Sequence, residues 1–94
     1  MGELVVITSA TCETCKLFER DVLPRVDVQG IPYRLLKMPQ RALKLPDDLR
    51  FLNPLVKSYP TIAYVKNSTA TLFPGRSTEG DRILQWMTVQ LASK

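Results

Sequence analysis

The sequence predicts an α/β fold: a mixed four-stranded sheet with helices on both faces and elements in the order β-α-β-α-β-β-α. Three observations predict it. Short β-branched runs alternate with stretches whose apolar residues recur at helical spacing. A strand, a helix and a second strand open the chain, which implies a parallel pair with a right-handed crossover. Two later strands are separated only by a polar turn, so they should pair as an antiparallel hairpin.

Size and composition indicate one domain covering residues 1–94. Hydrophobic residues make up 45% and charged residues 23% of the 94 residues, as in globular proteins. No apolar run reaches the roughly 18 residues that a membrane span needs. The net charge is +4, but the basic residues are scattered among acids and form no block. We therefore expect a monomer that binds neither nucleic acid nor a membrane.

The N-terminal half predicts strand, helix and strand. Residues 4–7 are apolar and mostly β-branched, which is typical of a strand buried on both faces. A turn of small residues, 8–11, leads into a helix over residues 12–30 that Pro24 should kink or shorten. Residues 31–38 predict the second strand. One face of the first helix is apolar, carrying Phe18, Val22 and Val26.

The C-terminal half begins with a short predicted helix over residues 47–57, which contains Pro54. Residues 61–66 and 69–73 predict the third and fourth strands, joined by a turn at residues 67–68.

The final helix has a weak capping-box signature, Thr78 followed three residues later by Asp81. Trp86 on this helix is expected to be partly buried packing. The apolar face of the helix consists of Ile83, Leu84, Met87 and Leu91.

Cys12 and Cys15, the only two cysteines, lie where the first turn meets its helix. A structural zinc site needs four ligands, and the chain has no second cysteine pair and no histidine. A purely structural disulfide would close too small a loop to remove much chain entropy. Simple burial does not suit Cys12, which lies between the polar residues Thr11 and Glu13. A reactive dithiol fits best.

The redox interpretation gives each cysteine a role. Unpaired N–H groups and the dipole at a helix N-terminus favour a thiolate, so Cys12 is the candidate nucleophile. Cys15, one turn later and nearer the apolar face, is the candidate resolving thiol. Glu13, Thr14 and Lys16 are candidate redox-tuning residues, because Glu13 opposes the thiolate and Lys16 favours it. Nothing else strongly stabilises a thiolate, so we predict an ordinary reductant.

Three segments carry a resemblance to known families. VVITSATCETCK resembles the opening of a glutaredoxin, and SYPTIAYVKN resembles the cis-proline segment of thioredoxins and protein disulfide isomerase domains. LFPGRSTEGDRILQWM is similar to the last strand, glycine turn and terminal helix of those domains. The chain is thereby identified as a member of the thioredoxin-like superfamily, with the dimensions of a glutaredoxin and a thioredoxin-like fold over nearly its whole length.

The resemblance implies that Pro60 is cis and faces the sulfur of Cys12, although an X-Pro bond taken alone favours trans. It makes Tyr59 a backbone partner for an extended substrate segment. The substrate-binding candidates are Thr11, Tyr59, Pro60, Thr61 and Gly75. Gly80 and Asp81 partly match the glutathione-binding turn of glutaredoxins and are candidates for glutathione binding. Val6 stands where thioredoxins bury an aspartate.

The resemblance implies a small thiol-disulfide oxidoreductase that reduces or exchanges disulfides in protein substrates. Its redox-active centre is the Cys12–Cys15 disulfide, with no metal or organic cofactor held permanently. A thioredoxin reductase or glutathione would renew the dithiol. The alternatives are a glutathione-dependent glutaredoxin, with glutathione as co-substrate, and a redox-inactive adaptor or metal-bridged dimer. No basic leader or cleavage site precedes the first strand, so we expect a cytoplasmic location.

Overall fold

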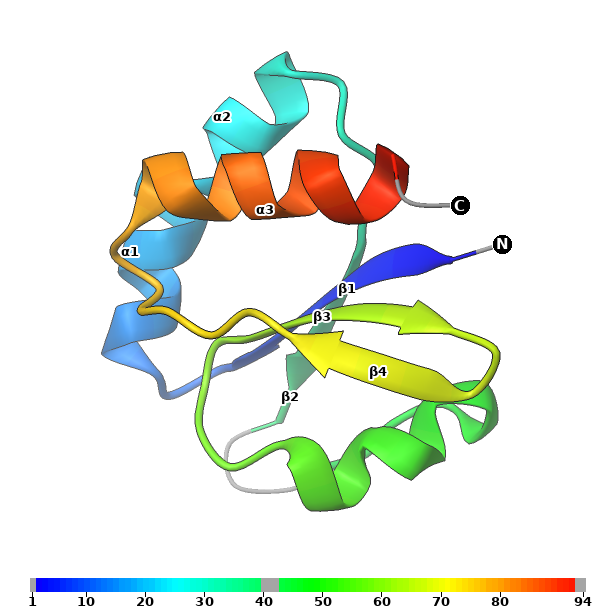
Figure 1. Cartoon of the computed structure of the whole chain (residues 1–94). Coiled ribbons are helices and arrows are strands. Elements are labelled where there is room, and N and C mark those ends of the chain that lie inside the picture. Colours follow the sequence, from blue (N-terminus) through cyan, green and yellow to red (C-terminus); the bar gives the residue numbers. More distant parts are fainter. Residues whose placement is uncertain (1, 40–42, 93–94) are drawn as a thin grey trace.

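The computed structural model describes residues 2–39 and 43–92. Its sheet has the strand order β2-β1-β3-β4. Strand β1 pairs parallel with β2 and antiparallel with β3, and β3 pairs antiparallel with β4 (Figure 1). The mixed four-stranded sheet predicted from the sequence is confirmed. The elements in chain order are β1 (Glu3–Ser9), α1 (Glu13–Asp21), α2 (Leu23–Val28), β2 (Arg34–Met38), the 3₁₀ helix η1 (Asp47–Leu55), β3 (Thr61–Lys66), β4 (Thr69–Leu72) and α3 (Gly80–Ala92).

Helices cover both faces of the sheet, as predicted. Successive side chains of a strand point to opposite faces, so the apolar run of β1 serves two cores. Leu4 and Val6 pack with residues of α1, α2 and α3, whereas Val5 and Ile7 pack with Leu49 and Leu52 of η1 and its neighbours. Figure 1 shows η1 on the side of the sheet away from the three α-helices. The site described below is built on this doubly buried central strand.

The predicted helix over residues 12–30 is two helices. Val22 ends α1 and caps α2, and Pro24 lies in the first turn of α2. Proline lacks an N–H and its ring clashes with the carbonyl four residues earlier, so α1 cannot continue through Pro24. Proline is well tolerated in a first turn, where the N–H has no helical partner. Over residues 2–39 and 43–92 no helix is long and apolar enough to cross a membrane.

Other bounds differ from the prediction for similar reasons. Strand β2 begins at Arg34 rather than at residue 31, because Pro32 cannot donate to the strand ladder. Helix η1 is 3₁₀ and ends at Leu55, one residue after Pro54. The β3–β4 turn is as expected: Asn67 and Ser68 have φ of 52° and 59°, the left-handed pair that a tight hairpin requires.

The lead-in to α3 is organised by Glu79 rather than by Thr78. The Glu79 carboxylate accepts the backbone N–H of Arg76 at 2.7 Å and pairs with Arg82 at 2.6 Å. These contacts hold the pKa of Glu79 below its ordinary value, the N–H of Arg76 being the largest cause and Arg82 the next. Trp86 is partly buried against the ring of Phe73, with the ring centres 5.6 Å apart.

Candidate active site

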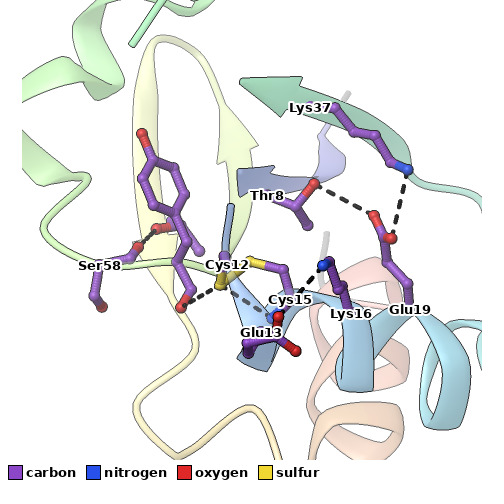
Figure 2. Close-up of a disulfide and its surroundings, with 10 residues drawn as sticks. Thr8, Cys12, Glu13, Cys15, Lys16, Glu19, Lys37 and Ser58 are labelled. Atoms are coloured by element: carbon purple, nitrogen blue, oxygen red, sulfur yellow. Dashed lines mark hydrogen bonds and ion pairs between the residues drawn. A yellow bond between two sulfur atoms is a disulfide. The ribbon is translucent and has the colours of Figure 1, made fainter. Parts of the chain in front are cut away.

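Sheet topology brings the two motifs of the sequence together. Strand β1 runs toward the cysteines and β3 runs away from Pro60, and the two strands are antiparallel, with Ile7 opposite Thr61. The carboxyl end of β1 therefore lies beside the start of β3. Cys12 and Tyr59 meet there, although 47 positions separate them in the chain. Figure 2 shows Cys12 and Cys15 at the start of α1, with Ser58 on the neighbouring segment.

Cys12 is the N-cap residue of α1. Its backbone is extended, with φ −96° and ψ 110°, while its carbonyl already accepts the N–H of Lys16 at 3.2 Å. The Cys12 Sγ accepts the backbone N–H of Cys15 at 3.0 Å. This is the hydrogen bond that a serine or aspartate cap makes, with sulfur in place of oxygen. The cap geometry directs an N–H and the positive end of the helix at the sulfur that the sequence marks as nucleophile.

Cys15 differs from Cys12 in exposure. Its side chain is 2% exposed, whereas that of Cys12 is half-buried. The two cysteines form a disulfide, with their Cα atoms 5.2 Å apart. Solvent and a second protein therefore reach Cys12 first, and Cys15 is reached through it. The arrangement suits attack by one thiol and release by the other.

The second motif lies against the Cys12 sulfur. The carbonyl oxygen of Tyr59 is 3.6 Å from Cys12 Sγ, a position where a reduced thiol would donate to it. The Tyr59–Pro60 peptide is cis, the isomer implied by the resemblance. Thr61 Oγ1 donates to the carbonyl of Ser58 at 2.6 Å, which closes the loop around the proline. The ledge formed by Tyr59, Pro60 and Thr61 is thus fixed next to the disulfide.

The charges beside the cysteines largely cancel. Lys16 Nζ lies 3.3 Å from the carboxylate of Glu13, and the two side chains are 61% and 84% exposed. An exposed pair of this kind leaves little net field at the sulfur, because water screens it and its charges are opposite. Thr11 and Thr14 are also exposed, on either side of Cys12 and Glu13. The helix terminus is therefore the main local influence on the sulfur.

Gly75 faces the same groove as Pro60 and Thr61, beside the proline. A side chain at Gly75 would collide with the ring of Phe73 and the carboxylate of Glu79, at 2.8 and 2.7 Å from a Cβ. Only glycine leaves both in place. The structure thus gathers the cysteines, the proline ledge and Gly75 at one end of the sheet.

Gly80 and Asp81 lie elsewhere. Gly80 is buried at the start of α3, where a Cβ would lie 2.6 Å from the Arg25 guanidinium of α2. The Asp81 carboxylate pairs with the same guanidinium. Neither residue is among those lining the groove beside Pro60. Gly80 thus allows the close approach of Arg25, and Asp81 makes an exposed ion pair between α3 and α2.

A polar group near the cysteines was not foreseen. Glu19, one turn after Cys15 in α1, accepts the hydroxyl of Thr8 at 3.4 Å and lies 3.5 Å from Lys37 Nζ (Figure 2). Thr8 is 1% exposed and the Glu19 side chain 25%. The i,i+4 spacing of Cys15 and Glu19 was the available signal, since such residues share a helix face. Val6 of β1, at the position where thioredoxins bury an aspartate, has no titratable group.

Metal binding by this chain would need more ligands than the cysteine pair. Within residues 2–39 and 43–92, no group of three or more histidine, cysteine, aspartate or glutamate side chains is placed to hold a metal ion.

Comparison with known proteins identifies the fold. No protein-family model and no curated protein matches the chain. Among solved structures, the reduced form of the periplasmic thioredoxin SoxS from Paracoccus pantotrophus superimposes with a TM-score of 0.62, over 97% of this chain and 99% of that one. The chain has a thioredoxin-like fold. At 18% sequence identity the likeness is one of fold. It agrees with the superfamily resemblance of the cysteine and proline segments, which the thioredoxin-like fold brings into contact.

The cytoplasmic location expected from the sequence is corrected by this comparison. A solved protein that shares the thioredoxin-like fold over nearly its full length is periplasmic. The expectation rested on the missing leader and on a reducing compartment for the cysteine pair. A reactive dithiol works wherever a partner renews it, so it carries no preference for such a compartment.

Proposed function

We propose that this protein is a thiol-disulfide oxidoreductase that reduces or exchanges disulfides in protein substrates, with Cys12 as nucleophile and Cys15 as resolving thiol. One observation carries the proposal. The half-buried Cys12 sulfur caps α1 and is bonded to a buried Cys15, facing the Tyr59 carbonyl. The thioredoxin-like fold supports it, since a periplasmic thioredoxin has the same fold.

The proposed reaction transfers two electrons. In the reduced protein, the Cys12 thiolate attacks one sulfur of a substrate disulfide, and that bond breaks as a mixed disulfide forms. The second substrate sulfur leaves as a thiolate and takes a proton from water. Cys15 then loses its proton and attacks the Cys12 sulfur, which releases the first substrate sulfur as a thiol. The product is the Cys12–Cys15 disulfide present in this structure.

A further reductant must return the dithiol. A thioredoxin reductase or glutathione supplies these two electrons in the proposed cycle, and run in reverse the same steps oxidise a substrate. Gly80 and Asp81 give glutathione no support, because neither lines the groove beside Pro60 and Asp81 pairs with Arg25.

Two single substitutions test the proposal. Cys15→Ser should accumulate a covalent complex with a disulfide protein such as insulin, because no thiol remains to resolve it. Cys12→Ser should form no complex and reduce nothing. The measurement is turbidity of reduced insulin, together with non-reducing electrophoresis of each variant.

The same pair distinguishes the alternatives. A Cys15→Ser protein that still turns over glutathione mixed disulfides would identify a glutaredoxin. A wild-type protein inert toward every disulfide would identify an adaptor and remove the proposed function.

A further inference from the structure

A groove of about 310 Å³ opens beside Pro60. Its lining is mainly apolar, and two of its residues, Leu55 and Leu72, are 37% and 36% exposed. Exposed large apolar side chains that border one hollow are typical of an interaction site. Its volume is at the low end of ligand pockets, which suits one side chain with its backbone better than a cofactor.

The groove lies near the Cys12 sulfur, because its lining residue Pro60 directly follows Tyr59. Pro60 lines it, and the preceding Tyr59 carbonyl lies 3.6 Å from Cys12 Sγ. A substrate cysteine bonded to Cys12 would therefore have its neighbouring residues close to Pro60, which lines the groove. Thr61 and Ile62 of β3 also line the groove, and both are buried. The groove would thus be filled by the substrate residues that flank the reacting cysteine.

The charge of the lining residues further restricts the chemistry of the segment that can bind in the groove. Lys57 is the one charged residue among those lining the groove, and it is exposed with no ion pair to any residue of 2–39 or 43–92. The carboxylate of Glu79, which lies beside Gly75 of the lining, is bound by Arg82 and by the N–H of Arg76. The groove therefore offers apolar walls and one available positive charge.

We propose that this groove selects protein substrates in which an extended segment next to the reactive cysteine carries an apolar side chain followed by a carboxylate. The apolar side chain lies between Leu55 and Leu72, and the carboxylate reaches Lys57. The inference rests on the proposed function, because it concerns substrates of the same sulfur. Glutathione fits poorly, since it has no apolar side chain to fill the groove.

Matched peptides test the charge preference. Three peptides would each carry one cysteine in a mixed disulfide and would differ only in the two residues that follow this cysteine. These two residues are Leu-Glu, Leu-Lys or Ser-Glu. The wild type should reduce the Leu-Glu peptide with a kcat/KM about fivefold above that of the Leu-Lys peptide, as expected for an exposed charge contact. Lys57→Glu should reverse this order. The preference should shrink at high salt.

Two control variants keep the test specific. Lys66→Glu makes the same charge change at the far end of β3 and should leave the preference intact. Leu72→Ala should lower the rate for the Leu-Glu peptide by about threefold to tenfold and leave the Ser-Glu peptide unchanged. Leu35→Ala, on the other edge strand with 37% exposure, should change neither rate.

The outcomes separate the two proposals. Equal rates for the Leu-Glu and Leu-Lys peptides, or a preference that survives Lys57→Glu in a folded variant, would overturn the groove assignment while the oxidoreductase stands. A wild type that reduces none of the peptides and no insulin removes the proposed function, and the groove assignment with it.

Discussion

At the scale of residues, the two cysteines differ by position alone. Cys12 caps α1 and receives the N–H of Cys15, whereas Cys15 lies one turn later among buried side chains. This asymmetry was predictable from the sequence, because a small-residue turn after an apolar strand marks where the helix begins. The role of Glu79 was not predictable in the same way. Its carboxylate accepts the backbone N–H of Arg76, in a turn that has no strong sequence signature.

The reduction potential follows from these residue contacts. The helix terminus favours a Cys12 thiolate, but the Glu13–Lys16 pair adds little net charge. We therefore expect a potential between about −270 and −200 mV, as in ordinary thioredoxins and glutaredoxins. Equilibration with glutathione and thioredoxin buffers measures it. A value near the −120 mV or so of a dedicated oxidase would contradict the weak-field picture.

At the scale of elements, prolines decided where the observed bounds differ from the predicted ones. Pro24 divides the first helix, and Pro54 lies near the end of a 3₁₀ segment that helical spacing alone could not distinguish from an α-helix. Apolar spacing locates a helix but does not show which backbone donors are missing. The predicted capping box was wrong for another reason: α3 begins at Gly80, so Thr78 is not its cap residue, and Asp81 pairs with Arg25 of α2.

The turn before α3 should respond to acid. The pKa of Glu79 is depressed from its ordinary 4.5, chiefly by the Arg76 N–H and then by Arg82. A carboxyl group whose pKa is lower in the folded than in the unfolded protein stabilises the fold at a pH above the unfolded pKa. That stabilisation is lost as the pH falls through the folded pKa. Glu79→Gln keeps an acceptor but no charge. The Tm difference between wild type and Glu79→Gln should therefore shrink between pH 6 and pH 3.

Thermal unfolding, followed by circular dichroism between pH 6 and pH 3, measures this Tm difference between wild type and Glu79→Gln. Asp47→Asn is a suitable control, because Asp47 makes an exposed ion pair with Arg50 in η1, outside the turn. A Glu79→Gln difference that stays constant with pH would show that the carboxylate charge contributes nothing to the turn.

At the scale of the whole molecule, two cores on either side of one sheet hold the site in place. The fold class was predictable because each strand and helix carries its own apolar period. The groove was not, because it joins η1, β3, β4 and the turn after β4, which no local pattern connects. Lys57 and Leu72 therefore escaped the sequence analysis. The compartment also escaped it, since a dithiol works in any compartment where a partner renews it.

Two leucines of η1 lie in different surroundings, Leu52 in the core and Leu55 in the lining of the groove. Leu52 is 0% exposed and Leu55 is 37% exposed. Leu52→Ala should lower the free energy of unfolding by about 2–5 kcal/mol, because it leaves a cavity in the core on that face. Leu55→Ala should cost about 1 kcal/mol or less, as surface substitutions do. Urea unfolding of both variants measures this, and equal losses would mean that η1 does not divide its leucines in this way.

The antiparallel pairing of β1 and β3 has a practical consequence. Glu3 lies opposite Val65, and Leu91 lines a hollow with Gly2 and Glu3, so both ends of the described chain gather near the β3–β4 hairpin turn, away from the sulfurs (Figure 1). A bead, a fluorophore or a fused partner attached there would leave the opposite pole open. The protein could then be attached to a solid support near its ends while the face that carries the cysteines stays open to large proteins.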